Sequence, residues 1–253
     1  MRRRADVNAC YRLDLAYDGT EFGGWAKQPG RRTVEGVLEE TLAVALRERV
    51  RLSVAGRTDA GVHALAQVAS FATAAAVEPE RLLLTLNALL PPDVAVQRVA
   101  RAADGFAARA ARARTYRYRL WLPNARPVFA ARYVWDVRGP VDLGLLDDGA
   151  RLLVGRRDFA ALSPSARLYH TCVRDVIAAA WSLSADAREA VFEIRASSFL
   201  HMMVRVAVGS MVDVAQGRLS PQQFADGLAG GKRAAMGRTA PARGLALVAV
   251  DYT

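Results

Sequence analysis

Apolar side chains alternate with polar or small ones near the start of the chain, where Tyr11, Leu13, Leu15 and Tyr17 recur at every second position. A period of two is typical of a strand with one buried face, so the pattern predicts a strand over residues 10–17. Because successive side chains of a strand point to opposite faces, we expect these four residues to share the face toward the core.

Helical spacing follows this strand. Thr33 is expected to cap a helix that runs to about Glu48, because the apolar residues after it recur three and four positions apart. They are Val34, Val37, Leu38, Thr41, Leu42, Ala45 and Leu46. A second helix is predicted between Pro79 and Leu90, and Pro91-Pro92 ends it because proline cannot continue the helical hydrogen bonding.

The rest of the chain repeats strands and helices in the same way. We expect further strands near residues 50–55, 65–71, 94–100, 113–121, 172–183, 189–197 and 245–251, and helices near 142–154, near 199–215 and from Ser220-Pro221 onward. Two successive groups of strands backed by helices indicate an α+β fold in two layered halves. The predicted halves are residues 1–108 and residues 109–253.

The composition narrows the class of protein. The 253 residues are 52% hydrophobic and 24% charged, as expected of a soluble globular chain, and there is no apolar run of about 18 residues that would suggest a membrane span. The start, MRRRADVNAC, lacks the apolar stretch of a secretory signal, so we expect the protein to stay in the cytoplasm. Two distant cysteines and three histidines show no metal-binding spacing, which predicts neither a disulfide scaffold nor a metal site.

Positive charge is the first functional signal. The chain has 35 basic and 25 acidic residues, a formal net charge of +10, which is typical of proteins that bind polyanions. A compositional bias of the source genome is the alternative, since Lys27 and Lys232 are the only lysines among the basic residues. Such a bias does not explain clustering, however, and residues 98–119 carry seven arginines against the single acid Asp104.

A short loop is the strongest candidate for chemistry. In residues 55–64, Gly56 and Gly61 flank Arg57-Thr58-Asp59 between two apolar segments. Glycines permit a tight loop, and loops held by rigid strands are where reactive groups usually lie. The alternative interpretation is a solvated turn in which Asp59 caps the backbone or pairs with Arg57.

Several motifs occur in a fixed order over nearly the whole chain, and together with this loop they resemble the tRNA pseudouridine synthases of the TruA type. They are Tyr17-Asp18-Gly19-Thr20, Phe22, Gly24-Trp25, Arg32-Thr33-Val34, residues 55–64, Gln67-Val68, Asn87, Leu90-Pro91, Phe106, Arg109, Tyr116-Arg117-Tyr118, Phe199-Leu200-His201, Met203-Val204-Arg205, Val208-Gly209, Ala240-Pro241 and Gly244-Leu245. Two departures stand out: Ala26 follows the tryptophan where the family usually has glutamine, and the segment between Phe106 and Tyr116 is one residue short.

The resemblance implies a fold, an activity and partners. The expected fold is that of pseudouridine synthases, with two ferredoxin-like halves, a mainly antiparallel sheet backed by helices, and a catalytic and RNA-binding cleft between the halves. The expected activity is isomerisation of uridine to pseudouridine in the anticodon arm of tRNA, at the family's tRNA positions 38–40. No cofactor and no metal are expected, and the family is homodimeric.

The resemblance also implies site residues. Asp59 corresponds to the family's essential aspartate. The reaction breaks the C1′–N1 bond, turns the uracil and forms a C1′–C5 bond, and a carboxylate could stabilise the cationic sugar, attack it or remove a sugar proton. Arg205 is expected to pair with Asp59 from the edge of an apolar helix stripe, beside His201. Tyr116 is expected to pack on the target uracil, which must leave its stack, while Arg57 holds the vacated place.

The basic segment adds candidates for RNA contact. Strand alternation places Arg112, Arg114, Tyr116 and Tyr118 on one face, with Arg117 and Arg119 on the other. Arginines beside tyrosines suit RNA, because guanidinium groups meet phosphates while rings stack on bases. Arg112, Arg114 and Arg117 are therefore predicted RNA contacts, Tyr118 is expected to be structural, and His63 and His201 are expected to be structural or to contact RNA.

Competing functions fit the residues less well. A non-catalytic basic α+β RNA-binding protein would need only the arginine-rich strand, and Asp59 would then be incidental. The chain has no GxxxxGK[ST] or GxGxxG motif for a nucleotide-dependent enzyme. A retaining glycosidase would need a second carboxylate in a comparable setting, and we find none in the sequence.

Overall fold

The computed structural model describes residues 9–253 and divides into two compact units. The first unit contains the described residues up to Ala111 together with Val248–Thr253, and the second contains Arg112–Leu247. The last strand, β10 (Leu245–Asp251), thus begins in the second unit and ends in the first. The predicted halves, residues 1–108 and 109–253, did not include this return of the chain to the first unit. Residues 1–8, in which we expect no secretory signal, lie outside the described part of the chain.

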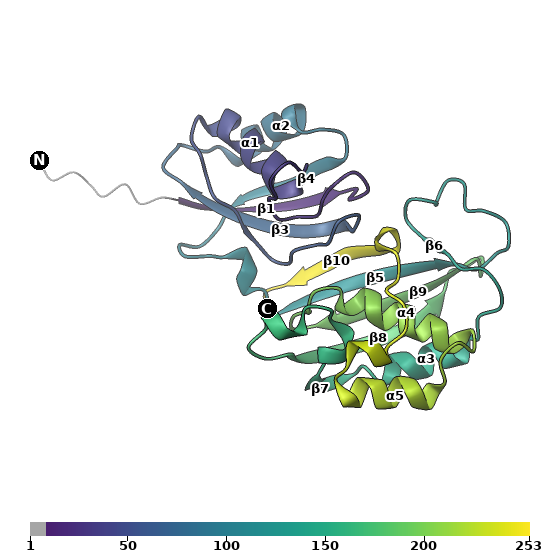
Figure 1. Cartoon of the computed structure of the whole chain (residues 1–253). Helices are drawn as coiled ribbons and strands as arrows, with labels where there is room; N and C mark the ends of the chain where they lie inside the picture. The colour runs from purple at the N-terminus through teal and green to yellow at the C-terminus, as the bar shows by residue number, and fades with distance from the viewer. Residues whose placement is uncertain (1–8) are drawn as a thin grey trace, which may run out of the picture. The chain divides into compact units, whose positions relative to one another are not determined.

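The first unit is an antiparallel sheet with two helices. Its strands are β1 (Ala9–Tyr17), β2 (Ser53–Val54), β3 (His63–Thr73) and β4 (Val94–Arg101), in the order β4-β1-β3, with β2 paired to β3. Its helices, α1 (Val34–Leu46) and α2 (Pro79–Leu89), lie over the same face of this sheet (Figure 1). The predicted strand at residues 50–55 was wrong in length, because the Leu52 N–H donates to Glu39 Oε1 of α1 at 3.1 Å rather than to a neighbouring strand.

Local sequence signals explain this unit well. The alternation in β1 is confirmed, since Leu13 and Leu15 are fully buried while Arg12, Asp14 and Ala16 beside them are partly exposed. Thr33 caps α1, because its side-chain oxygen accepts the Gly36 N–H at 3.3 Å. Asn87 fixes α2 to β4 through two hydrogen bonds, from its amide to the carbonyl of Val96 at 2.8 Å and from the Val96 N–H to its oxygen at 2.9 Å.

The second unit is a larger sheet covered on one side by three helices (Figure 1). Its strands are β5 (Ala113–Trp121), β6 (Trp135–Asp136), β7 (Gly155–Asp158), β8 (Val173–Leu183) and β9 (Glu189–Ala196). The order β5-β9-β8-β7 is antiparallel throughout, and β6 pairs parallel with β5. The sequence did not predict β6, which has two residues, or β7, whose Gly-Arg-Arg-Asp is largely exposed and shows no alternation.

The helices of this unit are α3 (Leu143–Arg151), α4 (Met203–Ala215) and α5 (Pro221–Gly230). Every residue of α4 except Arg205 is buried, so the single apolar stripe predicted for this helix was wrong. Since α3 and α5 both pack on α4, the helix has almost no solvent face to mark in the sequence. Its predicted start at residue 199 was also wrong, because Met202 has φ 60° and the helix begins only after this left-handed residue.

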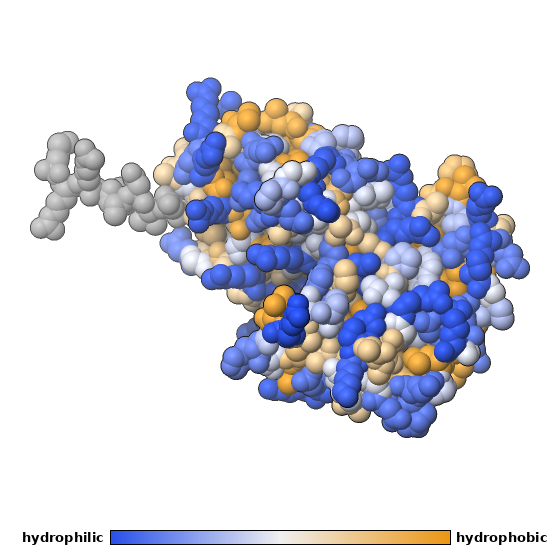
Figure 2. All heavy atoms as spheres, viewed as in Figure 1, coloured by the Kyte–Doolittle hydropathy of each residue, from blue (hydrophilic) through white to orange (hydrophobic). Residues whose placement is uncertain are grey.

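The α+β class is confirmed in both units, whose strands are mainly antiparallel and backed by helices. Among residues 9–253, no helix is both long and apolar enough to cross a lipid bilayer. Figure 2 shows a viewed face that is mostly hydrophilic, with apolar side chains in small groups.

Gly209 tests how closely α4 packs on the rest of the second unit. A Cβ at Gly209 would lie 1.9 Å from the carbonyl oxygen of Arg238, so we expect Gly209→Ala to lower the free energy of unfolding by about 1–3 kcal/mol. Gly230→Ala is the control, because no atom lies within 4 Å of its added Cβ; stability should be unchanged or up to about 1 kcal/mol higher. Urea unfolding of both variants measures this, and equal stabilities would contradict the close packing.

Candidate active site

The loop that carries Asp59 connects β2 to β3 and is fixed by buried polar side chains of the first unit. The hydroxyl groups of Tyr17 and Thr58 are 2.8 Å apart and share a hydrogen bond, and Gln67 Nε2 donates to the Tyr17 hydroxyl at 3.2 Å. The same Gln67 nitrogen donates to the carbonyl of Gly56 at 2.7 Å. Tyr17, Thr58 and Gln67 are all buried, so the hydrogen-bonded cluster holds the loop from beneath.

A second loop, residues 18–25, packs on the first with backbone against backbone. The Trp25 N–H donates to the carbonyl of Thr58 at 3.0 Å, and the Gly61 N–H donates to that of Phe22 at 3.3 Å. Glycine is required at this contact, because a Cβ at Gly19 would lie 2.0 Å from the Val62 carbonyl oxygen. The two loops therefore fix each other.

Asp59 lies at the turn of this fixed loop. Its neighbour Thr58 is buried, Ala60 is exposed, and Asp59 itself is half-buried. The carbonyl of Asp59 accepts the Val62 N–H at 3.1 Å, which closes the turn, and Gly61 follows with φ 78°. The backbone at the carboxylate is thus rigid while the side chain remains partly accessible, which is the arrangement that a reactive carboxylate needs.

Arg57 and His63 flank Asp59 in different surroundings. Arg57 is exposed, as a residue that contacts RNA must be. His63 is only 5% exposed, and its Nδ1 accepts the Gly19 N–H at 3.1 Å. His63 therefore connects the two loops, and little of its ring is available to a ligand.

The predicted alternation along β5 is confirmed in the second unit. Arg114, Tyr116 and Tyr118 lie on the buried face, while Arg117 and Arg119 lie on the opposite face. The two outer arginines form cross-strand ion pairs with β9, Arg117 to Glu193 and Arg119 to Glu189, each with a closest approach of 2.6 Å. Arg112 is exposed and precedes the first residue of β5.

Tyr116 and Arg114 contact the segment that leads to α4. The ring of Tyr116 meets Phe199 edge to face, with centroids 5.1 Å apart and an interplanar angle of 86°. Arg114 is 8% exposed, and its Nη1 donates to the carbonyl of Ser197 at 2.8 Å. This arginine therefore has a structural hydrogen bond, which the count of basic residues did not predict.

His201 does not lie on α4, contrary to the expected position one turn before Arg205. It precedes the left-handed Met202, and its backbone N–H donates to the Tyr169 hydroxyl at 3.0 Å. Its ring nitrogen Nδ1 lies 2.9 Å from the hydroxyl of Ser165. The side chain is exposed beside the loop that contains these two residues.

Arg205 is the one residue of α4 that is not buried, and its position is fixed by residues near Ala240. Its Nε donates to the Ala240 carbonyl at 2.9 Å, and its own carbonyl accepts the Ala240 N–H at 2.9 Å. Tyr118 lies close by and donates to the carbonyl of Pro241 at 2.7 Å. Burial raises the pKa of Tyr118, and the charges of Arg205 and Arg243 oppose that increase.

The anchoring residues were not predicted as part of the site. Tyr17, Gln67 and Ala240 were noted only as members of motifs, and nothing in a single sequence shows which residues a hydroxyl or carbonyl will meet. A polar residue inside an otherwise apolar strand was the available signal for Gln67, since such a residue needs a buried partner.

Comparison with known proteins identifies the family of this chain. A family model described as tRNA pseudouridine synthase matches residues 15–109 and 150–253. The chain belongs to the tRNA pseudouridine synthase family. Proteins of this family are isomerases that convert uridine to pseudouridine in tRNA. The family resemblance drawn from the motifs is therefore confirmed.

Individual relatives match over almost the whole length. The tRNA pseudouridine synthase A of Syntrophotalea carbinolica is 41% identical over 243 residues, 95% of both chains. That of Geotalea uraniireducens is 38% identical over 95% of this chain and 98% of its own. That of Corynebacterium glutamicum is 42% identical over 95% of this chain and 88% of its own.

The family model covers the candidate site unevenly. Asp59 and Arg205 lie within its matched segments, whereas Arg112, Arg114, Tyr116 and Arg117 lie between them, in residues 110–149. The match therefore includes the carboxylate loop and α4 but leaves out β5.

The buried hydroxyl of Tyr17 makes the stability of the first unit sensitive to alkaline pH. Burial raises its pKa from 10.0 to about 12, so between these pH values the folded chain keeps a proton that the unfolded chain has lost. This contribution to stability is complete below pH 10 and falls by up to about 2.7 kcal/mol as the pH rises to 12. Tyr17→Phe should lower stability near neutral pH by about 1 kcal/mol, through lost hydrogen bonds.

As the pH rises above 10, the free energy of unfolding of Tyr17→Phe should fall less than that of the wild type, because the variant has no hydroxyl at this position to titrate. Urea unfolding of both proteins between pH 8 and pH 12 measures the difference. Parallel pH profiles would show that Tyr17 does not keep its proton in the folded state.

Proposed function

We propose that this protein isomerises uridine to pseudouridine in the anticodon arm of tRNA, at the tRNA positions 38–40 that the family resemblance implies, and that Asp59 is its catalytic carboxylate. The supporting observation is the way Asp59 is held: a half-buried carboxylate at a rigid turn, between loops that pack backbone on backbone. A solvated turn residue would not need this support. No cofactor takes part in the proposed reaction.

The reaction requires a group such as Asp59. The C1′–N1 bond breaks, the uracil turns, C5 bonds to C1′, and the proton that C5 loses is balanced by the one that N1 gains. A carboxylate can stabilise the cationic sugar, attack C1′ and later leave, or remove a sugar proton. Each of the three roles needs a negative charge held still next to the sugar.

Residues other than Asp59 complete the proposal. We assign Arg205 to act together with Asp59 on the same nucleotide, and Tyr116 to pack on the target uracil once it has left its stack. Arg57 takes the place that the base vacates. The proposed RNA contacts are Arg57, Arg112, Arg114, Arg117, His63 and His201, and among them Arg57, Arg112 and His201 have the exposure that such contacts require.

We also propose that the protein is a homodimer that works in the cytoplasm, where tRNA is modified. The outer face of the second unit's sheet supports the homodimer, because Ala178, Ala180 and Ser182 of β8 are small and exposed there. A second copy would pack on this face. A monomeric mass in sedimentation equilibrium would contradict the dimer.

Asp59→Asn should abolish turnover and leave tRNA affinity within a few-fold, because the change keeps the size of the side chain and removes its charge. The assay is incubation with an unmodified tRNA transcript, followed by chemical mapping of pseudouridine. Asp104→Asn is the matched control, since Asp104 is an exposed carboxylate of the same unit, and it should stay active. If Asp59→Asn forms pseudouridine at the wild-type rate, another residue is the catalytic group. If the wild type itself forms none, the non-catalytic RNA-binding alternative holds.

Two substitutions separate the ring of Tyr116 from its hydroxyl. Base stacking on an aromatic ring is worth about 1–3 kcal/mol, so Tyr116→Ala should weaken productive binding of the target by roughly ten- to a hundred-fold. Tyr116→Phe keeps the ring, and it should turn over normally unless the hydroxyl moves a proton, in which case the rate should fall by about 10²–10⁴-fold. Single-turnover rates on one transcript decide between these roles, and a fully active Ala variant would mean that Tyr116 only fills the core.

Salt dependence tests the proposed RNA contacts. Each phosphate contact contributes about 0.7–0.9 to the slope of log affinity against log salt concentration. Arg112→Ala should flatten the slope by about this amount, whereas Arg151→Ala on α3, an exposed arginine paired with Asp147, should not change it. Equal slopes for wild type and Arg112→Ala would remove Arg112 from the RNA surface.

A further inference from the structure

Residues 236–241, which we call the strap, cross α4 in the second unit and contact Arg205. The strap lies between two short 3-10 helices, η4 (Arg233–Ala235) and η5 (Ala242–Gly244). At its far end Ala240 makes two hydrogen bonds with Arg205, one to the side chain and one to the backbone. The direction of the Arg205 guanidinium therefore depends on where the strap lies.

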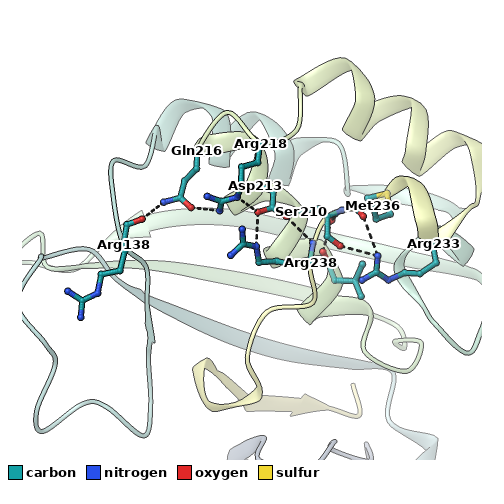
Figure 3. A network of polar contacts seen from close by, with 10 residues as sticks. Arg138, Ser210, Asp213, Gln216, Arg218, Arg233, Met236 and Arg238 are labelled. Carbon is teal, nitrogen blue, oxygen red and sulfur yellow. Dashed lines mark hydrogen bonds and ion pairs between the residues drawn. The ribbon is translucent and has the colours of Figure 1, made fainter.

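Asp213, two turns further along α4, anchors the other end of the strap (Figure 3). Its Oδ2 accepts the backbone N–H of Arg238 at 2.9 Å, and its Oδ1 lies 2.8 Å from Arg238 Nε and 2.7 Å from Arg218 Nε. Ser210, one turn earlier, accepts the Gly237 N–H at 3.0 Å. One buried carboxylate thus binds both the backbone and the side chain of Arg238.

The strap has no room to shift on this surface. A Cβ at Gly237 would lie 2.6 Å from Asp213 Oδ2 and 2.9 Å from Ser210 Cα. Arg233 holds the strap from the opposite side, where its guanidinium donates to the Gly237 carbonyl at 3.0 Å and to the Thr239 hydroxyl at 3.0 Å (Figure 3). All of these contacts hold the segment whose Ala240 binds Arg205.

Asp213 is 7% exposed, and the proposed reaction gives it no role. A buried carboxylate is costly unless it is paired, so the two arginines and the backbone N–H offset its desolvation. Arg218 also donates to Gln216, whose amide in turn donates to the Arg138 carbonyl at 2.6 Å, and this extends the network away from the strap (Figure 3). The carboxylate is the point at which strap and network meet.

From these contacts we infer that Asp213 is a positioning residue for the reaction: through the strap, it sets the direction in which α4 presents Arg205. The inference rests on the proposed role of Arg205 in the function above. It predicts that loss of the Asp213 charge slows the chemical step while tRNA binding persists, because displacement of a catalytic group by about an ångström costs up to about a hundred-fold in rate.

Asp213→Asn is the first test. The amide keeps the size of the side chain but loses the ion pairs to Arg218 and Arg238, so the single-turnover rate on a tRNA transcript should fall about 10- to 100-fold, with tRNA affinity within about three-fold of wild type. Gly237→Ala is the second test, because it keeps the Asp213 charge while the added Cβ, 2.9 Å from the Ser210 Cα, pushes the strap off α4; it should show the same loss of rate. A wild-type rate for either folded variant would overturn the inference.

A double variant separates action through Arg205 from general damage. In the Arg205→Met background, Asp213→Asn should cause no further loss of rate, because the group that it positions is already absent. An additional loss equal to that in the wild-type background would show that Asp213 acts by another route, and would overturn the inference. A wild-type rate for Arg205→Met alone would instead refute the proposed role of Arg205, and with it the basis of the inference.

Two controls separate positioning from stability. Asp147→Asn on α3 removes an exposed ion pair to Arg151 in the same unit, and its rate should equal that of wild type. Phe192→Leu on β9 weakens the ring contact with Trp181, 5.0 Å between centroids, and provides a variant with lowered Tm in which no residue of the strap or of α4 is changed. If Phe192→Leu loses as much rate as Asp213→Asn at a similar Tm, the effect is one of stability and the inference fails.

Discussion

Backbone packed directly on backbone fixes both segments that carry the proposed site residues Asp59 and Arg205. In the first unit, Gly19 lies so close to Val62 that any side chain at this position would overlap the Val62 carbonyl. In the second, Gly209 of α4 makes the same kind of contact with Arg238. Because backbone atoms cannot rotate away as side chains do, such contacts hold Asp59 and Arg205 more firmly than side-chain packing would.

Buried polar groups support these contacts in two different ways. Beneath the Asp59 loop, the cluster of Tyr17, Thr58 and Gln67 is neutral, and every hydroxyl and amide that it contributes has a partner. Beneath the strap, Asp213 is charged and is matched by Arg218 and Arg238. A neutral cluster costs less to bury, whereas a charged one is destabilised severely by loss of a single partner.

The excess of positive charge is only partly available to a polyanion. Arg114 bonds to a backbone carbonyl, Arg117 and Arg119 pair with glutamates on the neighbouring strand, and Arg233 holds the strap. A net charge of +10 still attracts RNA at a distance. Local contacts, however, depend on exposed arginines such as Arg57 and Arg112, which the count of charges does not distinguish from the others.

The sequence by itself determined the features that arise from neighbouring residues. Strand alternation in β1 and β5, the Thr33 cap of α1 and the glycine-bounded turn at Asp59 depend on chain spacing and local hydrogen bonds, and all of them appear in the structure. The family followed from motifs read in order along the chain. Tertiary structure decided which of the candidate side chains are buried and what holds them.

Three features in particular could be seen only in the folded chain. Helix α4 is buried everywhere except at Arg205, so its sequence carries no polar face from which its start or the surroundings of Arg205 could be predicted. The left-handed Met202, which removes His201 from the helix, has no local signal, since methionine rarely adopts that conformation. Arg205 binds Ala240 of the strap, which lies 35 positions further along the chain. A contact between residues so far apart is fixed by the packing of whole elements, which no local pattern encodes.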